Sequence, residues 1–395
     1  MESWRELRRL PRRLWVLSAA ALINRAGTMA LPFLTLYLTR ALGLSATRAG
    51  ALLALYGAVS LVVMPFAGRL CDTWGTDRLM LTSLTVSSLS MLAFPSARTF
   101  AQAAAVIVVW SLSTEAFRPA VMTAVSEAAP ESLRKQAYAL NRLAVNLGMS
   151  VGPALGGYLA TVSFRSIWYV DAATSLAAVV ALWAALLPAR ASRHEDAPPV
   201  SARGLSDPRL RALLLASLPV SVVFFQHEGP MPVYLVRDLG LPPSFYGFLF
   251  TINTAIIVAL EVPLNHATAR WSHARTLSLG AALFAAGFGA YGLGSMRWHI
   301  ALATVVWTFG EMVLMPGMTA YVAEISPEGR RGEYMGLYMM AFSLSFMLGP
   351  WAGLWTLENH GARALWGLCL LLGAVSAALF SRLSVRASSS PLPRP

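Results

Sequence analysis

The chain matches itself at an offset of 197 residues, and this internal repeat limits the possible folds more than any other feature. Residues 37–44 reappear as residues 234–241, with six of the eight positions identical. The same offset holds far downstream without a gap, because Pro153 falls on Pro350. Two copies of 197 residues account for all but one of the 395 positions. The sequence therefore predicts one structural unit that occurs twice.

The composition places this doubled unit in a membrane. The chain is 56% hydrophobic and 13% charged, whereas globular proteins are about 25% charged. Apolar runs of about 20 residues can cross a hydrocarbon core of roughly 30 Å as helices. Such runs lie at 14–38, 46–67, 79–96, 100–125, 136–160 and 166–187, and again at 212–236, 244–266, 275–293, 298–323, 333–356 and 363–381. The predicted fold class is an all-α integral membrane protein with twelve transmembrane helices in two pseudo-symmetric six-helix bundles.

The basic residues predict the orientation of these spans. Twenty-one of them fall on the side of the N-terminus and seven on the opposite side. By the positive-inside rule, both termini are expected in the cytoplasm, in a multi-pass protein of the cytoplasmic (inner) membrane. Because the net charge of +12 sits in short loops at the membrane ends, anionic lipid is the expected partner and nucleic acid is not. A monomer is expected.

A polar segment rich in proline, serine and arginine separates the two copies. We predict an N-terminal bundle at 1–187, a cytoplasmic linker at 188–208 and a C-terminal bundle at 209–395. Each copy has an even number of spans, so both have the same orientation. Such parallel repeats are related by an axis along the membrane normal and enclose a central site.

The loop after the second span resembles a signature of the major facilitator superfamily, Gly-x-Leu-Ala-Asp-Arg-x-Gly-Arg-Lys. Gly68, Leu70, Asp72 and Gly75 match it, whereas most of its basic positions do not. The resemblance covers essentially the whole chain and implies the major facilitator fold. It also implies that this loop latches the two halves together on the cytoplasmic side, with Asp72 capping a helix of the opposite half. Alternatively, Asp72 is a turn residue. The residues expected at this gate are Gly68, Asp72, Gly75, Arg78, Glu127 and Arg134.

The fifth span carries a more specific motif. Its sequence Gly148-x-x-x-Gly152-Pro153-x-x-Gly156-Gly157 resembles the antiporter signature of the same superfamily at every fixed position. Small residues four apart let another helix approach closely, and proline removes a helix hydrogen bond. We therefore predict a hinge at these five residues, with ordinary helix packing as the alternative. The resemblance implies proton-coupled export, notably of drugs.

Ionisable residues inside apolar spans are costly and mark functional sites. Glu115, Glu228, Glu311 and Arg25 are the predicted proton-coupling residues, because a carboxylate in a poorly hydrated cavity can take up a proton near neutral pH. Asn24, Arg25, Arg118, Phe225, Glu228 and Tyr338 are the residues expected to line the substrate cavity. Glu115 and Arg118 stand at i and i+3, so an alternative is that they neutralise each other. Asp171, near the outer end of the sixth span, is expected to form a gate ion pair or to snorkel.

These residues predict a proton-coupled antiporter that exports small apolar or amphiphilic compounds by alternating access. No catalytic residue, metal or cofactor is expected, and the proton gradient is the expected energy source. The first alternative is a proton symporter that imports a nutrient, metabolite or siderophore-like compound. A polytopic membrane enzyme and a sensor without transport are further alternatives. An enzyme is disfavoured because the six histidines are scattered.

Overall fold

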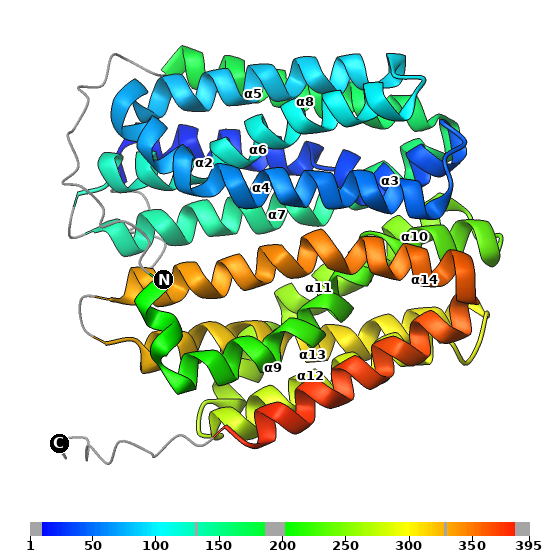
Figure 1. Ribbon diagram of the computed structural model, residues 1–395. Helices are drawn as coiled ribbons and strands as arrows, with labels where there is room; N and C mark the ends of the chain where they lie inside the picture. The colour runs from blue at the N-terminus through cyan, green and yellow to red at the C-terminus, as the bar shows by residue number, and fades with distance from the viewer. Residues whose placement is uncertain (1–9, 131–132, 186–201, 328–329, 384–395) are drawn as a thin grey trace, which may run out of the picture. The chain divides into compact units, whose positions relative to one another are not determined.

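The computed structural model describes residues 10–130, 133–185, 202–327 and 330–383, and these are almost entirely helical (Figure 1). No β-strand occurs within these ranges. The all-α fold class predicted from the apolar runs is therefore confirmed. Most of the predicted linker at 188–208 lies outside the described residues, which resume with the short 3₁₀ helix η3 (Ala202–Ser206). The division into bundles at this linker stays a prediction.

The first copy of the repeat follows the predicted spans closely. Its helices are α2 (Arg12–Gly27), α3 (Ala30–Arg40), α4 (Ala46–Trp74), α5 (Thr76–Ala93), η1 (Phe94–Ser96), α6 (Phe100–Ala128), α7 (Arg134–Val162) and α8 (Phe164–Ala185). The difference from the predicted pattern lies in the first span, where α2 and α3 replace one continuous helix.

The break between α2 and α3 explains the role of Asp171. One carboxylate oxygen of Asp171 accepts hydrogen bonds from the backbone N–H groups of Met29 and Ala30, at 3.2 and 3.0 Å. These are N–H groups at the start of α3, which lack partners within the helix. The expectation that Asp171 forms a gate ion pair or snorkels is wrong, because the side chain is buried and caps a helix instead.

The second copy contains the broken helix that the Gly-Pro sequence indicates. Its elements are α9 (Pro208–Phe224), η4 (Phe225–His227), α10 (Pro230–Val233), the π-helix η5 (Tyr234–Asp238), α11 (Pro243–Thr268), α12 (His273–Ala290), α13 (Arg297–Ile325) and α14 (Arg331–Ser381). Gly229 and two prolines interrupt the helix here, since proline provides no N–H group for a helix hydrogen bond. The apolar run at 212–236 is therefore not one continuous helix.

The number of membrane crossings depends on a single glycine. Ten helical stretches of the described residues are long and apolar enough to cross a membrane. The longest, α14, has 51 residues, but Gly361 inside it has φ 81° and ψ 174°, which ends one helix and starts another. A total of twelve is reached when α14 is divided at Gly361 and the 18-residue α12 is included.

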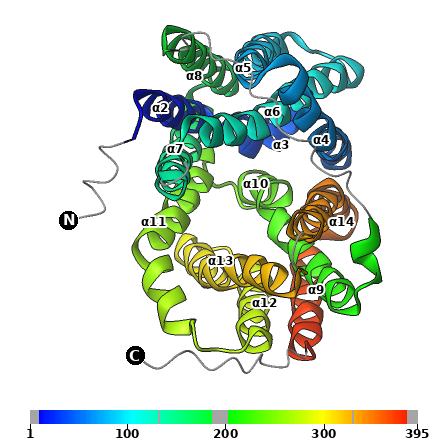
Figure 2. The ribbon, with the colours of Figure 1, turned by 90° about the vertical axis from the view of Figure 1, so that its left-hand side faces the viewer.

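Contacts group the described residues into two compact units. The first contains the described residues of 1–198 together with Phe225–Ala255 and Ser343–Ala362. In this unit α5 packs against α6 and α8, and α2 packs against α7 and α8 (Figure 2). The second contains the described residues of 199–224, Ile256–Phe342 and those from 363 onward, and in it α12 packs along α13.

Equivalent tryptophans are buried in the two units. Trp110 lies edge-to-face against Trp168, with ring centroids 5.5 Å apart. Its repeat partner Trp307 donates a hydrogen bond from its indole N–H to the Tyr291 hydroxyl at 2.9 Å. Both indoles belong to aromatic clusters of the core. The equivalent positions of the two tryptophans in the repeat therefore reflect packing.

Candidate functional site

A pocket of about 410 Å³ lies within the first unit, between α2, α6 and α7. Its wall is formed by Ala21, Asn24, Arg25, Phe117, Arg118, Pro119, Val121, Met122, Asn141 and Val145. Three residues expected at the substrate cavity, Asn24, Arg25 and Arg118, thus lie in one wall. The rest of that wall is largely apolar, as in most small-molecule sites.

Glu115 on α6 is held beside this pocket by two neighbours. The hydroxyl of Tyr56 donates a hydrogen bond to one Glu115 oxygen at 3.3 Å. The guanidinium of Arg118 lies 3.5 Å from the other oxygen. The Glu115 side chain is 8% exposed and that of Arg118 is 54% exposed. The intrahelical pair that the spacing suggests is present, and it connects a buried carboxylate to a cation that lines the pocket.

Asn141 on α7 is a pocket residue that the sequence interpretation missed. The residue is 1% exposed. Neither its amide nitrogen nor its amide oxygen has a hydrogen-bond partner among the described residues. A buried amide without partners costs free energy. The signal for Asn141 in the sequence is a polar residue inside the apolar run 136–160, and it is not ionisable.

The glycine motif of α7 packs against the segment that carries Arg25. A Cβ atom built at Gly148 would lie 2.6 Å from the Cβ of Arg25, and one at Gly152 would lie 2.9 Å from the carbonyl oxygen of Thr28. One at Gly156 would lie 2.7 Å from a side-chain carbon of Met29. These distances are too short for a side chain, so the glycines allow α7 to approach the break between α2 and α3.

The last glycine of the motif faces a different helix. A Cβ atom at Gly157 would lie 3.0 Å from the Cα of Gly247 on α11. A Cβ at Gly247 would lie 2.6 Å from the carbonyl oxygen of Pro153. The close packing expected from the motif is therefore seen on two sides of α7. The helix is continuous through Pro153, and the hinge stays a prediction.

Glu228 stands at the break between η4 and α10. Its carboxylate lies 3.7 Å from the imidazole of His227, and Glu115 is an electrostatic neighbour. Phe225, one turn earlier, contacts Phe346 with ring centroids 5.0 Å apart. The ring centroid of Phe346 in turn lies 6.1 Å from that of Tyr56, whose hydroxyl donates a hydrogen bond to Glu115. The broken helix and Glu115 thus belong to one connected region of the first unit.

Two predicted site residues lie in the second unit. Glu311 is partly buried on α13, and Tyr338 is buried near the start of α14. The predicted proton-coupling set therefore divides into Glu115, Glu228 and Arg25 in the first unit and Glu311 in the second.

The predicted latch is described only in part. The surroundings of Gly68 and the side chains of Asp72 and Arg134 are not described. Gly75 joins α4 to α5 with φ 85°, and Arg78 is exposed on α5.

Two polar contacts hold the start of α5. Glu127 accepts a hydrogen bond from Thr76 at 3.0 Å. Arg13 forms an ion pair with Asp77 at 2.7 Å. The ion pair connects the first span to the third and was not predicted, because it joins residues 64 positions apart.

Helices from both copies of the repeat also meet within the first unit. A Cβ atom at Gly57 of α4 would lie 2.9 Å from the Cα of Met347 on α14. The guanidinium of Arg40 donates to the carbonyl oxygen of Val236 at 2.8 Å. We call these α4–α14 and α3–η5 contacts the seam. They bring together segments about 200 to 290 positions apart.

Comparison with known proteins gives the family. The sequence pattern of the Major Facilitator Superfamily matches residues 16–242 and 213–395. The chain is 25% identical over 377 residues to the "Uncharacterized MFS-type transporter YqjV" of Bacillus subtilis, covering 92% of this chain and 90% of that protein. It is 21% identical over 367 residues to a "Na(+), Li(+), K(+)/H(+) antiporter" of Planococcus maritimus, covering 83% and 85%.

A shorter match and a solved structure agree with this. The "Quinolone resistance protein NorA" of Staphylococcus aureus is 26% identical over 152 residues, or 38% of this chain and 39% of NorA. The crystal structure of the nucleoside transporter NupG superposes with a TM-score of 0.77 at 14% identity, covering 93% and 96%. These relatives are transporters rather than enzymes, as the sequence predicts. The chain belongs to the Major Facilitator Superfamily of membrane transporters.

Proposed function

We propose that the chain is a proton-coupled antiporter that exports small apolar or amphiphilic compounds by alternating access. The observation that carries the proposal is the position of Arg118, which lines the pocket while it pairs with the buried Glu115. A change in the charge of Glu115 therefore changes the electrostatics of the pocket wall.

The coupling follows from this pair. While Glu115 is ionised, the positive charge of Arg118 is balanced at 3.5 Å. When Glu115 takes up a proton, the wall that holds Arg25 and Arg118 becomes more positive by one charge. A cationic amphiphile then binds less well, since like charges repel strongly in a low-dielectric site. Proton and compound oppose each other's binding, which is the condition for exchange.

Glu228 and Glu311 are the further candidates for protonation. Glu228 lies in the region that Phe225, Phe346 and Tyr56 connect to Glu115. Ionisable groups at membrane depth are functional by default. We assign Arg25 the role of tuning Glu115 from the pocket wall.

The same wall defines the second candidate function. Two arginines favour an anion, and protonation of Glu115 strengthens rather than weakens that attraction. An anionic compound would therefore bind together with the proton and be carried by symport. The charge of the transported compound decides between the two modes.

Alternating access is supported by the close helix packing. The glycine motif of α7 lets neighbouring helices approach closely, and we assign it the role of a hinge. The seam joins segments of both copies, and we assign it the role of an outer gate. Gly68, Asp72, Gly75, Arg78, Glu127 and Arg134 remain the proposed latch at the opposite end.

The comparisons favour exchange over uptake. Two relatives have names that describe ion/proton antiport and quinolone resistance. We further propose a monomer in the cytoplasmic membrane, with both termini in the cytoplasm and the proton gradient as the only energy source.

Transport in proteoliposomes tests the proposal. An imposed pH gradient of either sign is combined with ethidium, a lipophilic cation, and separately with an anionic dye. Antiport predicts that an inward proton gradient stimulates ethidium efflux and that Glu115→Gln loses this stimulation. Glu324→Gln, at an exposed position on α13, is the matched control and keeps it. Anion accumulation with protons would replace antiport by symport, and stimulation retained in Glu115→Gln would remove Glu115 from the mechanism.

A further inference from the structure

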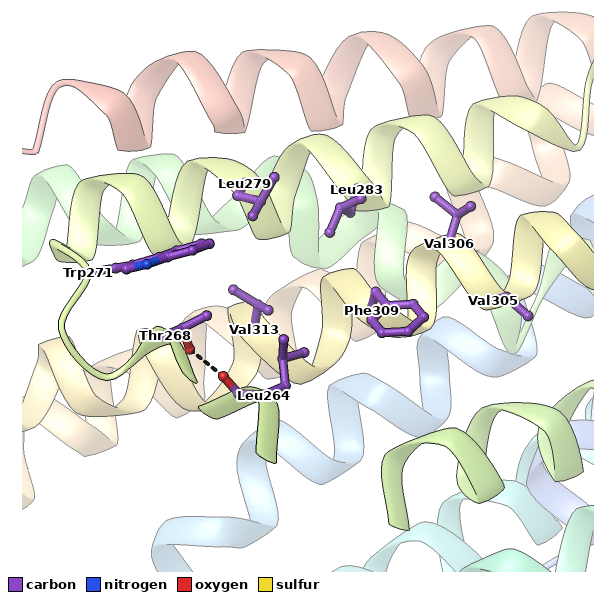
Figure 3. Close-up of a pocket in the computed structure, with 9 residues that line it drawn as sticks. All are labelled: Leu264, Thr268, Trp271, Leu279, Leu283, Val305, Val306, Phe309 and Val313. Carbon is purple, nitrogen blue, oxygen red and sulfur yellow. Dashed lines mark hydrogen bonds between the residues drawn. The ribbon is translucent and has the colours of Figure 1, made fainter. Parts of the chain in front are cut away.

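A second cavity lies in the second unit, and none of the residues assigned to coupling lines it. It has a volume of about 480 Å³ and is bounded by α11, α12 and α13 (Figure 3). The size is within the usual range of ligand sites, roughly 300 to 1,000 Å³. We call this cavity the groove.

The walls of the groove are apolar. Leu264 comes from α11, Leu279 and Leu283 from α12, and Phe309 and Val313 from α13. The hydroxyl of Thr268 donates to the carbonyl oxygen of Leu264 at 2.9 Å, so it is satisfied by its own helix (Figure 3). The groove therefore offers a ligand no unsatisfied polar group along its sides.

One end of the groove is aromatic and basic. Trp271 lines this end, and the guanidinium of Arg275 lies 4.1 Å from the centroid of its indole ring. Arg270 is exposed next to Trp271. Tryptophan and arginine together mark the level of lipid headgroups, where the indole is half in water and the cation meets phosphate.

The length of the groove fits one leaflet. From the start of α12 at His273 to Leu283 the helix rises about 15 Å, at 1.5 Å per residue. Half of a hydrocarbon core of roughly 30 Å is the same length. A chain that enters beside Trp271 thus ends near the middle of the membrane.

We propose that the groove binds one anionic phospholipid, with an acyl chain along α11, α12 and α13 and the phosphate at Arg270 and Arg275. The site is separate from the pocket and requires neither antiport nor symport. The positive charge of the chain, +12 in total, favours a lipid with negative charge.

Quenching of tryptophan fluorescence tests this site. The purified full-length protein is reconstituted with phosphatidylglycerol or phosphatidylcholine whose acyl chains carry bromine. The signal of Trp271 is obtained as the difference between the wild type and Trp271→Phe. We expect stronger quenching by brominated phosphatidylglycerol, and an affinity about tenfold lower in the Arg270→Gln/Arg275→Gln variant.

Variants that fill the groove distinguish binding of the acyl chain from binding of the headgroup. Leu283→Phe or Val306→Phe should remove the Trp271 quenching, and the second variant keeps the test open if the first does not fold. Val258→Phe, at a position of α11 that is 71% exposed and outside the groove, is the control. Equal quenching by both lipids would contradict the preference for an anionic headgroup. Unchanged quenching in the variants with a filled groove would show that the acyl chain does not bind in the groove.

Discussion

The Tyr56 hydroxyl donates a hydrogen bond to the Glu115 carboxylate at 3.3 Å, joining α4 to α6 inside the first unit. A hydrogen bond to a buried charged group contributes about 1.5 to 3 kcal/mol. Tyr56→Phe is therefore expected to slow proton-driven transport by about tenfold, which corresponds to roughly 1.4 kcal/mol. Initial transport rates in proteoliposomes measure the effect.

Because of this contact, we expect Tyr56 and Glu115 to act together in transport. Tyr56→Phe should add little to the loss of transport already caused by Glu115→Gln, since the effects of substitutions at two residues in contact are not additive. Independent, multiplicative losses in the double variant would show that Tyr56 acts elsewhere.

The seam is expected to be sensitive to added volume at Gly57. A Cβ atom there would lie 2.9 Å from the Cα of Met347, and backbone cannot rotate away as a side chain can. Gly57→Leu should lower the free energy of unfolding by about 1 to 3 kcal/mol. Thermal unfolding in detergent measures this. Gly367→Leu on α14 is the control, because a Cβ atom at Gly367 meets nothing within 4 Å. Equal melting temperatures of the two variants would contradict the close packing.

Gly148 is expected to affect transport through Arg25. A Cβ atom at Gly148 would lie 2.6 Å from the Cβ of Arg25, so Gly148→Ala must move the pocket wall or α7 itself. We expect transport to be lost while the protein remains monodisperse in detergent. Gly336→Ala is the matched control, since a Cβ atom there meets nothing within 4 Å. Normal transport by Gly148→Ala would argue against both the hinge and the pocket.

Asp207, just before α9, makes stability depend on pH. Partial burial raises the pKa of the Asp207 carboxyl, but hydrogen bonds from Arg209 and from the Tyr334 hydroxyl, the latter at 2.9 Å, outweigh it and hold that pKa below its ordinary value. A lowered pKa in the folded state contributes stability above the unfolded value of about 3.9, and this stability is lost as the pH falls through the folded pKa.

Asp207→Asn is therefore expected to be less stable than the wild type at neutral pH, by about 1 kcal/mol. The difference should shrink as the pH falls below 4, within the range in which the protein stays folded. Melting temperatures at a series of pH values test it, and a difference that stays constant down to acidic pH would exclude the carboxylate as its source.

The helices of this fold can be predicted from the sequence because each membrane-spanning helix is a contiguous apolar run. The break at Gly229 and the Glu115–Arg118 pair are also local, since each depends on neighbours within a few positions. The cap by Asp171 could not be predicted, because Met29 and Asp171 are 142 positions apart. The contact between Phe346 and Tyr56 could not be predicted for the same reason. Each lies in an apolar run, and nothing local indicates that α4 and α14 pack together.

The seam also has a consequence for how a duplicated chain can diverge. After a duplication, each copy can accumulate changes freely as long as its own contacts are kept. Here Phe225–Ala255 and Ser343–Ala362 of the second copy belong to the same compact unit as the first copy. Substitutions at Gly57 or Arg40 are therefore constrained by the other copy's backbone, and the two halves must evolve as partners along the seam.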